Sequence, residues 1–299
     1  MAQPSICEDS QPVNRERLKV VYVMGAGRSG STIFGVTLGN CADVFYAGEL
    51  DAWLARSGVP QLDGAERTRF WSAVRDQVSA AEELFGNEAQ RCLERSLAAF
   101  RIHKWPTRRR IRRRYRRIAE DLYCAIGRAS GVTHIVDTSH YPLRARELQQ
   151  LDGVDLYLVY LVRNPHSVVA SFRRKDVAQY SKSPLRTNAY LWLTNLLAVS
   201  VFLRHPRDRR LVVRYEDLIE NPREMLRHIL ARVDSHAAPP DLASLKTGIP
   251  FQGNRVIRSE QVAFESKAAP AARHSRMTTL LQLPWAFVLA RLRPAAMPR

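Results

Sequence analysis

Apolar residues follow two alternating patterns along the chain, short continuous runs and longer stripes with the period of a helix. The runs at 18–24 and 156–162 are typical of buried parallel strands, and shorter runs at 44–46, 134–136 and 211–213 predict further strands. Helical patterns occupy 31–38, 165–174, 188–203 and 222–232. Strands that alternate with helices imply right-handed crossovers. The pattern therefore predicts an α/β fold, with a central parallel β-sheet flanked by helices on both faces.

A long stretch between the second and third predicted strands is mainly helical in pattern. Its clearest apolar stripe is Ile111, Tyr115, Ile118, Leu122 and Ile126. We expect one domain over 19–299, with a helical insertion at about 55–130 and a flexible tail at 1–18. The apolar positions of 278–292, which Pro284 interrupts, predict a helix within a C-terminal helix and tail at about 265–299.

Positive charge is in large excess, with 46 Lys and Arg against 29 Asp and Glu, a formal net charge of +17. Such a chain suits a polyanionic partner, whether nucleic acid, an acidic membrane surface or a multiply phosphorylated ligand. Residues 108–117 include eight arginines. The apolar stripe continues through this run, so a solvated helix face is one interpretation and recruitment of an anionic acceptor or lipid is another. The aromatic and basic residues do not interleave as in base-stacking proteins, which disfavours nucleic acid and leaves peripheral membrane contact open.

The termini and cysteines bear on the cellular compartment. Residues 1–17 lack the basic and then apolar pattern of a signal peptide, and no run of ~18 apolar residues occurs. The four cysteines are isolated in the sequence, which argues against a disulfide framework or a zinc site. We therefore expect a cytoplasmic protein without a metal.

A glycine-rich turn, residues 25–32, lies between the first predicted strand and the following helix. Backbone N–H groups and the helix dipole converge in such a turn and form an anion site. Gly25, Gly27 and Gly30 match the dinucleotide-binding pattern G-x-G-x-x-G, and Glu49 lies about where the ribose-binding acid would be. The match to the kinase pattern G-x-x-x-x-G-K fails at Ser31, which replaces the phosphate-binding lysine. A purely structural turn is a further alternative.

The same turn also resembles the 5′-phosphosulfate loop of sulfotransferases that use 3′-phosphoadenosine 5′-phosphosulfate (PAPS), in its arginine-bearing form. The resemblance implies that the loop amides and hydroxyls hold the 5′-phosphate and that Arg28 faces the sulfuryl group. The residues concerned are Gly27, Arg28, Ser29, Gly30, Ser31 and Thr32.

A second motif is more specific. Arg163 ends a predicted buried strand, Pro165 opens a helix, and Ser171 lies on that helix's second turn. This spacing can direct a guanidinium and a hydroxyl at one phosphate. It is similar to the 3′-phosphate motif of sulfotransferases, which implies that Arg163 and Ser171 bind the donor's 3′-phosphate. The alternative is a helix-capping arginine beside a solvent-facing serine.

Three further stretches extend the resemblance over about 18–260. Residues 214–218, followed by Asn221 and Pro222, look like the family's strand-end R-Y-E-D-L, whose role is structural. Gly253, Asn254 and Arg255 resemble the G-N-R segment that closes over the 3′-phosphate. Residues 137–140 occupy the place of a bacterial D-S-S-K, with His140 in place of the lysine. A dinucleotide-binding oxidoreductase accounts neither for the Arg163 motif nor for the segments at 253–255 and 137–140.

The resemblance implies an enzyme that moves the sulfuryl group of PAPS to an acceptor hydroxyl by in-line displacement, leaving 3′,5′-adenosine bisphosphate. Related bacterial and tyrosyl-protein sulfotransferases carry a base glutamate after this loop, which implies Glu49 as base, Arg28 on the sulfuryl group and His140 as reserve base. A capping or surface role for Glu49 stays open. We expect a small-molecule or glycolipid acceptor, and the oligomeric state stays open. The rival hypothesis is a basic P-loop-like scaffold that binds nucleotide or nucleic acid without chemistry.

Overall fold

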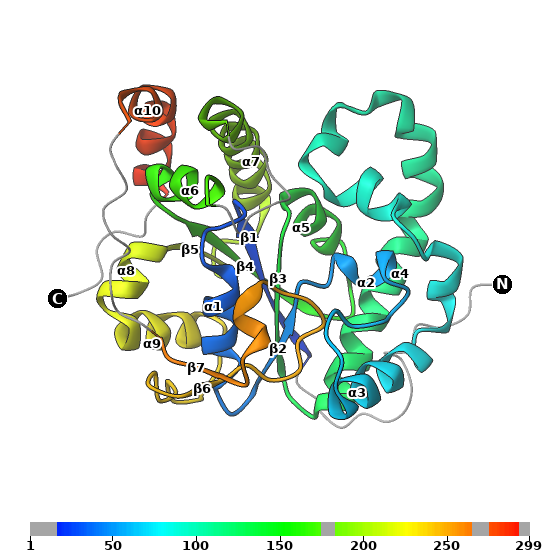
Figure 1. The fold of residues 1–299 in the computed structure, drawn as a ribbon. Helices are drawn as coiled ribbons and strands as arrows, with labels where there is room; N and C mark the ends of the chain where they lie inside the picture. The colour runs from blue at the N-terminus through cyan, green and yellow to red at the C-terminus, as the bar shows by residue number, and fades with distance from the viewer. Residues whose placement is uncertain (1–16, 175–182, 265–274, 293–299) are drawn as a thin grey trace.

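The computed structural model describes residues 17–174, 183–264 and 275–292, and its centre is a parallel five-stranded sheet (Figure 1). The strand order is β2-β3-β1-β4-β5, with every neighbouring pair parallel. The strands are β1 (Lys19–Gly25), β2 (Val44–Gly48), β3 (His134–His140), β4 (Asp155–Val162) and β5 (Arg210–Arg214). The α/β fold predicted from the sequence is confirmed.

Helices cover both faces of this sheet (Figure 1). Helices α3 (Ala65–Asp76), α4 (Trp105–Ser130), α5 (Pro142–Leu148) and α7 (Pro184–Arg204) contribute to the core on one face. Helices α1 (Ser31–Leu38), α8 (Tyr215–Glu220) and α9 (Pro222–Arg232) contribute to the core on the other. The remaining α-helices are α2 (Ala52–Ala55), α6 (Pro165–Phe172) and α10 (Arg276–Arg291).

The central strand explains why the sequence pattern is a continuous apolar run. Val20, Tyr22 and Met24 of β1 belong to one core, and Val21 and Val23 belong to the other. Side chains alternate across a strand, so a strand covered on both faces is apolar at every position. The run at 18–24 therefore predicted a strand that is buried on both faces.

The predicted helical insertion contains more than regular helices. Between α3 and α4 the chain forms four short turns, η2 (Ser79–Leu84), η3 (Gln90–Glu94), η4 (Ser96–Phe100) and η5 (Ile102–Lys104).

Nearer the C-terminus, a small antiparallel pair, β6 (Leu245–Lys246) and β7 (Gln261–Val262), brackets the short turn η6 (Arg255–Arg258). The sequence pattern missed this pair because each strand has two residues.

One predicted element boundary was wrong. Strand β3 continues to His140 and does not end at Val136, because Tyr22 and Met24 of β1 pair with Asp137 and His140. Helix α10 runs through Pro284, in agreement with the helix predicted over 278–292. Packing on α7 supports the helix there, since the indole rings of Trp192 and Trp285 lie 5.1 Å apart.

Two further findings concern the cysteines and the membrane. Cys41 and Cys92 are buried free thiols, whereas Cys124 is disulfide-bonded, which its isolation in the sequence did not predict. Within residues 17–174, 183–264 and 275–292, no helix combines the length and the apolar character that crossing a bilayer requires.

The topology fixes where a ligand can enter. Strand β1 lies between β3 and β4, so the chain leaves β1 toward one side of the sheet and later returns on the other side. In open α/β sheets the crevice beside the carboxyl ends of the strands at this reversal is the usual ligand site. The loops that follow β1 and β4 flank this crevice.

Candidate functional site

A cavity of about 750 Å³ opens at this crevice. Four arginines line it, and none of the described lining residues is acidic. The arginines are Arg28, Arg163, Arg174 and Arg255, and the hydroxyl of Ser171 lies among them. An excess of guanidinium groups without balancing carboxylates favours a ligand with several negative charges.

The loop after β1 has a conformation that only some residues accept. Arg28 has φ 69° and Gly30 has φ 96°, both in the left-handed region. A Cβ on Gly30 would lie 2.2 Å from Cε2 of Tyr215, so the phenol ring packs directly against the backbone. The Ser29 hydroxyl donates to the carbonyl of Ala26 at 2.7 Å. Helix α1 then begins at Ser31 without a side-chain cap, so its first amides face the crevice.

Tyr190 of α7 contacts this loop and was missed at the sequence level. Its hydroxyl accepts a hydrogen bond from the Gly27 amide at 2.8 Å, and its ring packs edge-on against Phe172. A tyrosine on the apolar face of a predicted helix is expected to lie in the core, and nothing in the sequence indicates that it contacts residue 27.

Arg163 and Ser171, the pair predicted from the second motif, lie together at the cavity. The Nη1 of Arg163 donates to the carbonyl of Arg28 at 2.9 Å, and its Nε has no hydrogen-bond partner in the described structure. The Nε of Arg28 donates to the Ser171 hydroxyl at 3.1 Å. These two bonds join the loop after β1 to the loop and helix after β4, although the motifs are 143 residues apart.

The strand end at 214–218 reaches the site as well. The guanidinium of Arg163 lies over the ring of Tyr215, 4.5 Å from its centroid. Glu216 accepts a hydrogen bond from the Asn164 amide at 2.8 Å. The sequence suggested a structural role for this stretch. Its contacts with Arg163 and Asn164 support the wall of the cavity.

The segment between β6 and β7 brings Asn254 and Arg255 to the cavity wall. The Asn254 carboxamide accepts from the Val256 amide at 2.8 Å and so caps η6. The preceding Gln252 carbonyl accepts from the Glu49 amide at 2.8 Å. A Cβ on Gly48, whose φ is 84°, would lie 2.3 Å from this carbonyl, so the segment packs closely on the end of β2.

Glu49, the predicted base, follows β2 beside this segment. Burial raises the pKa of Glu49 to about 7, while the amide of Gln252 and the charge of Arg28 act in the opposite direction. Glu49 is not among the described residues that line the cavity, but its carboxylate lies within the electrostatic reach of Arg28. The carboxylate can therefore accept a proton near neutral pH.

His140, the reserve base, ends β3 with φ 57°. Its ring centroid lies 4.3 Å from that of Tyr141, and its Nε2 is 4.0 Å from where a Cβ on Gly27 would be. Burial lowers the pKa of His140 to about 4, so the ring is neutral at pH 7. Like Glu49, it lies outside the cavity lining in the described structure.

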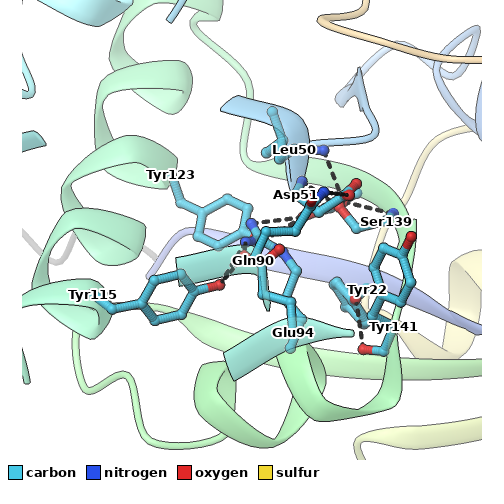
Figure 2. A network of polar contacts seen from close by, with 11 residues as sticks. Tyr22, Leu50, Asp51, Gln90, Glu94, Tyr115, Tyr123, Ser139 and Tyr141 are labelled. Carbon is cyan, nitrogen blue, oxygen red and sulfur yellow. Dashed lines mark hydrogen bonds and ion pairs between the residues drawn. The ribbon is translucent and has the colours of Figure 1, made fainter. Parts of the chain in front are cut away.

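Behind β3 lies a buried polar network that the sequence analysis did not anticipate (Figure 2). Arg144 of α5 forms ion pairs with Glu94, at 2.7 Å, and with Asp137, at 3.3 Å. The phenols of Tyr115 and Tyr123 reach in from α4 and donate to the same two carboxylates. All five side chains are buried, and they are contributed by four separate elements.

The network extends to the backbone next to Glu49. Asp137 accepts from the Ser139 amide and hydroxyl, and the Ser139 hydroxyl accepts from the Asp51 amide at 2.9 Å (Figure 2). Gln90 donates to Asp51 at 2.7 Å, and burial raises the pKa of Asp51 well above its usual value. The network therefore fixes the backbone and the side chain of Asp51, two residues after Glu49.

A family model described as the sulfotransferase family matches residues 21–238. Two solved structures are similar in fold. A sulfotransferase domain from the curacin biosynthetic pathway has 17% identity and a TM-score of 0.51, covering 91% of this chain and 99% of that one. A sulfotransferase domain from the Synechococcus PCC 7002 olefin synthase has 18% identity and a TM-score of 0.52, covering 97% and 100%. A search of curated protein sequences gives no match.

Proposed function

The chain belongs to the sulfotransferase family, and from this premise we propose that it transfers the sulfuryl group of PAPS to an acceptor hydroxyl. The observation that carries the proposal is the arginine-lined cavity at the carboxyl edge of β1 and β4. PAPS carries a 3′-phosphate and a 5′-phosphosulfate, so two anionic groups must be held at once. The cavity offers arginines from both flanking loops, which suits this charge distribution.

The 3′-phosphate is assigned to Arg163 and Ser171, with Gly253, Asn254 and Arg255 closing over it. The support is the arrangement of Arg163, whose Nη1 donates to the Arg28 carbonyl and whose guanidinium lies over the ring of Tyr215. Its Nε lacks a partner among the described residues. A fixed guanidinium with an unused donor binds an anion at little cost in side-chain entropy.

The 5′-phosphosulfate is assigned to the loop after β1, residues 27–32. The amides at the uncapped start of α1 and the hydroxyls of Ser31 and Thr32 are available to the phosphate. Arg28 is assigned to the sulfuryl group, because its charge also reaches Glu49. Positioned cations and amides stabilise the charge that builds on the leaving phosphate.

The donor supplies the sulfuryl group, and the chain's part is to orient it and to remove the acceptor's proton. We assign proton removal to Glu49, whose pKa of about 7 suits a base at neutral pH. His140, with its pKa lowered to about 4, is the weaker base and is assigned to orienting the acceptor. The acceptor class is a small molecule or a glycolipid with a hydroxyl group.

Nucleotide calorimetry tests the assignment of the donor. The protein should bind 3′,5′-adenosine bisphosphate at least tenfold more tightly than 5′-AMP, since charged hydrogen bonds to the 3′-phosphate contribute about 1.5–3 kcal/mol. Equal affinity for the two nucleotides contradicts the proposal. NADH serves as the control for the dinucleotide-binding alternative.

Mass spectrometry tests the reaction itself. Cell extract incubated with enzyme and PAPS should gain species that carry an added SO₃ group, and extract with enzyme alone should not. Tight binding of the bisphosphate without any sulfated product would favour the rival hypothesis, a nucleotide-binding scaffold without chemistry.

A further inference from the structure

The arginine-rich run and the short turns before it form one exposed surface, which the proposed function does not use. Residues 95–117 include eleven Lys and Arg and no Asp or Glu. In Figure 1 this part of the chain lies at the edge of the molecule opposite α8 and α9. We call residues 95–114 the basic–apolar segment.

Part of the arginine run is structural. Arg112 and Arg116 pair with the buried carboxylate of Glu147 on α5, at 3.1 and 2.8 Å. Arg114 pairs with Glu83. By contrast, Arg109, Arg110 and Arg113 are exposed, and no described carboxylate forms an ion pair with them. The basic face is therefore not neutralised by the described part of the chain.

Large apolar side chains project from the same segment. Their exposed fractions are 61% for Leu97, 65% for Phe100, 80% for Ile102 and 53% for Trp105. Four such residues within nine positions differ from the single exposed apolar residues found on most proteins. Leaving them in water forgoes their burial energy, so this arrangement favours a partner that covers them.

The apolar and basic groups form one surface. The guanidinium of Arg109 lies 4.2 Å from the ring centroid of Trp105. Arg108 donates to the carbonyl of Arg101 at 3.2 Å, and Arg101 donates to that of Arg91 at 3.3 Å. These contacts fold the short turns against the first turns of α4, where an exposed guanidinium lies beside an exposed apolar ring.

We propose that the basic–apolar segment binds the surface of a membrane that contains anionic lipids. Arginines next to a tryptophan and projecting aliphatic side chains are the composition of interfacial membrane anchors. The apolar groups enter the boundary between headgroups and acyl chains, while the arginines remain at the phosphates. Nucleic acid fits less well, since it offers nothing to cover Leu97 or Ile102, and Arg109 already covers Trp105.

The start of this segment lies near His140, which the proposed function assigns to orienting the acceptor. Arg95, at the start of the segment, is close enough to His140 for its charge to contribute to the lowered pKa of that ring. Membrane binding needs neither donor nor acceptor, so it can be tested independently of the proposed sulfuryl transfer.

Vesicle co-sedimentation of the full chain, without PAPS, tests the proposal. The protein should bind vesicles of phosphatidylcholine with phosphatidylglycerol and should not bind pure phosphatidylcholine. The variant R109Q/R110Q/R113Q should lose about 100-fold in affinity, because each arginine contributes about fivefold near an anionic surface. The variant F100S/I102S should lose about tenfold and become more sensitive to salt.

Matched controls separate this surface from the general positive charge. R207Q/R223Q/R227Q removes three exposed arginines elsewhere, and L203S/L280S removes two exposed leucines from α7 and α10. Both controls should bind the anionic vesicles like the parent, and circular dichroism should show every variant folded. Equal losses in the controls, or a DNA duplex that the parent binds while ignoring vesicles, would overturn the proposal.

Discussion

Arg144 and Arg163 carry the same side chain but lie in two regions of the molecule with opposite surroundings. Arg144 is buried between two carboxylates and two phenols, and the protein itself balances its charge. Arg163 is held by a backbone carbonyl and a ring face, at a cavity whose described lining includes no acid. The surroundings of an arginine therefore distinguish a structural cation from one that is available to a ligand.

The largest expected effect is on the ligand side of this comparison, at Glu49. Glu49→Gln keeps the shape and removes the proton acceptor, so turnover should fall by about 10²–10⁴. In the parent, turnover should rise with pH through about 7, because the ionised carboxylate is the base. Initial rates should be measured with the least acidic acceptor found, because an acidic phenol needs less help.

His140→Asn is the matched control for this experiment. Its loss of turnover should be smaller, because a ring with a pKa of about 4 is a weak base. Bisphosphate affinity should stay unchanged in both variants. A Gln variant that works normally beside an inactive Asn variant would assign the base to His140.

Next in size is the effect of breaking the closed network. Arg144→Met leaves Glu94 and Asp137 buried without their cation, so the free energy of unfolding should fall by about 3–5 kcal/mol. Urea denaturation measures this loss. Arg146→Met on the same helix removes a partly exposed arginine paired with Glu147 and should cost less than about 1 kcal/mol. Equal losses in the two variants would show that the buried carboxylates do not make Arg144 more important for stability than Arg146.

Arg28 sharpens the ligand side of the comparison. Arg28→Ala should lower turnover by about 10²-fold, because the guanidinium meets charge that grows during transfer. Bisphosphate affinity should fall much less, since the bisphosphate lacks the sulfuryl group. An affinity loss as large as the turnover loss would place Arg28 on the phosphates alone.

Replacing Arg163 should lower the affinity for the bisphosphate and leave the free energy of unfolding unchanged. Arg163→Ala should weaken bisphosphate binding by about 1.5–3 kcal/mol in calorimetry. The exposed Arg173, a neighbour of Ser171 outside the described cavity lining, is the control, and Arg173→Ala should bind normally. If Arg163→Ala instead lowered the unfolding free energy as much as Arg144→Met, Arg163 would be a structural cation too.

The smallest effect is on the pH dependence of stability. The raised pKa of Glu49 means that the folded protein holds this proton more tightly than the unfolded chain does between pH about 4.5 and 7. Stability should therefore fall as pH rises through this range, on the order of 1 kcal/mol because the half-buried group is partly screened by water. Urea midpoints of the parent minus those of Glu49→Gln isolate this slope, and a flat difference contradicts the raised pKa.

Subtracting the variant is necessary because His140 acts in the opposite direction. Its lowered pKa means that the unfolded chain binds this proton more tightly between pH about 4 and 6.5. Its contribution to stability is therefore lost as pH falls through that range. Both proteins share this term, so it cancels in the difference.

Local patterns in the sequence predicted the parts of the fold that are buried on both sides. Strands β1 and β4 are apolar at nearly every position, and α1 was predicted with the bounds that the structure has. The end of β3 was missed because Asp137 and Ser139 read as a polar loop. In the structure they are buried strand residues whose polar atoms bond to one another and to the Asp51 amide.

Local patterns likewise predicted only part of the candidate site. Motif spacing predicted that Arg28, Arg163 and Ser171 lie together, because each lies after a strand or on the helix that follows it. Tyr190, Tyr215 and Gln252 reach the site only through long-range packing, which no local pattern encodes. The arginine run contained a structural part and an exposed part, and only the position of Glu147 separates them.

The close packing of Tyr215 on Gly30 also bears on how this enzyme can change over evolutionary time. Any side chain at position 30 would meet the phenol ring and would also have to accept a φ of 96°. A mutation there is therefore blocked until position 215 becomes smaller, but losing that ring removes the support beneath Arg163. The two positions therefore constrain each other, and a loop transplanted from a relative should be accepted only together with its own partner for Gly30.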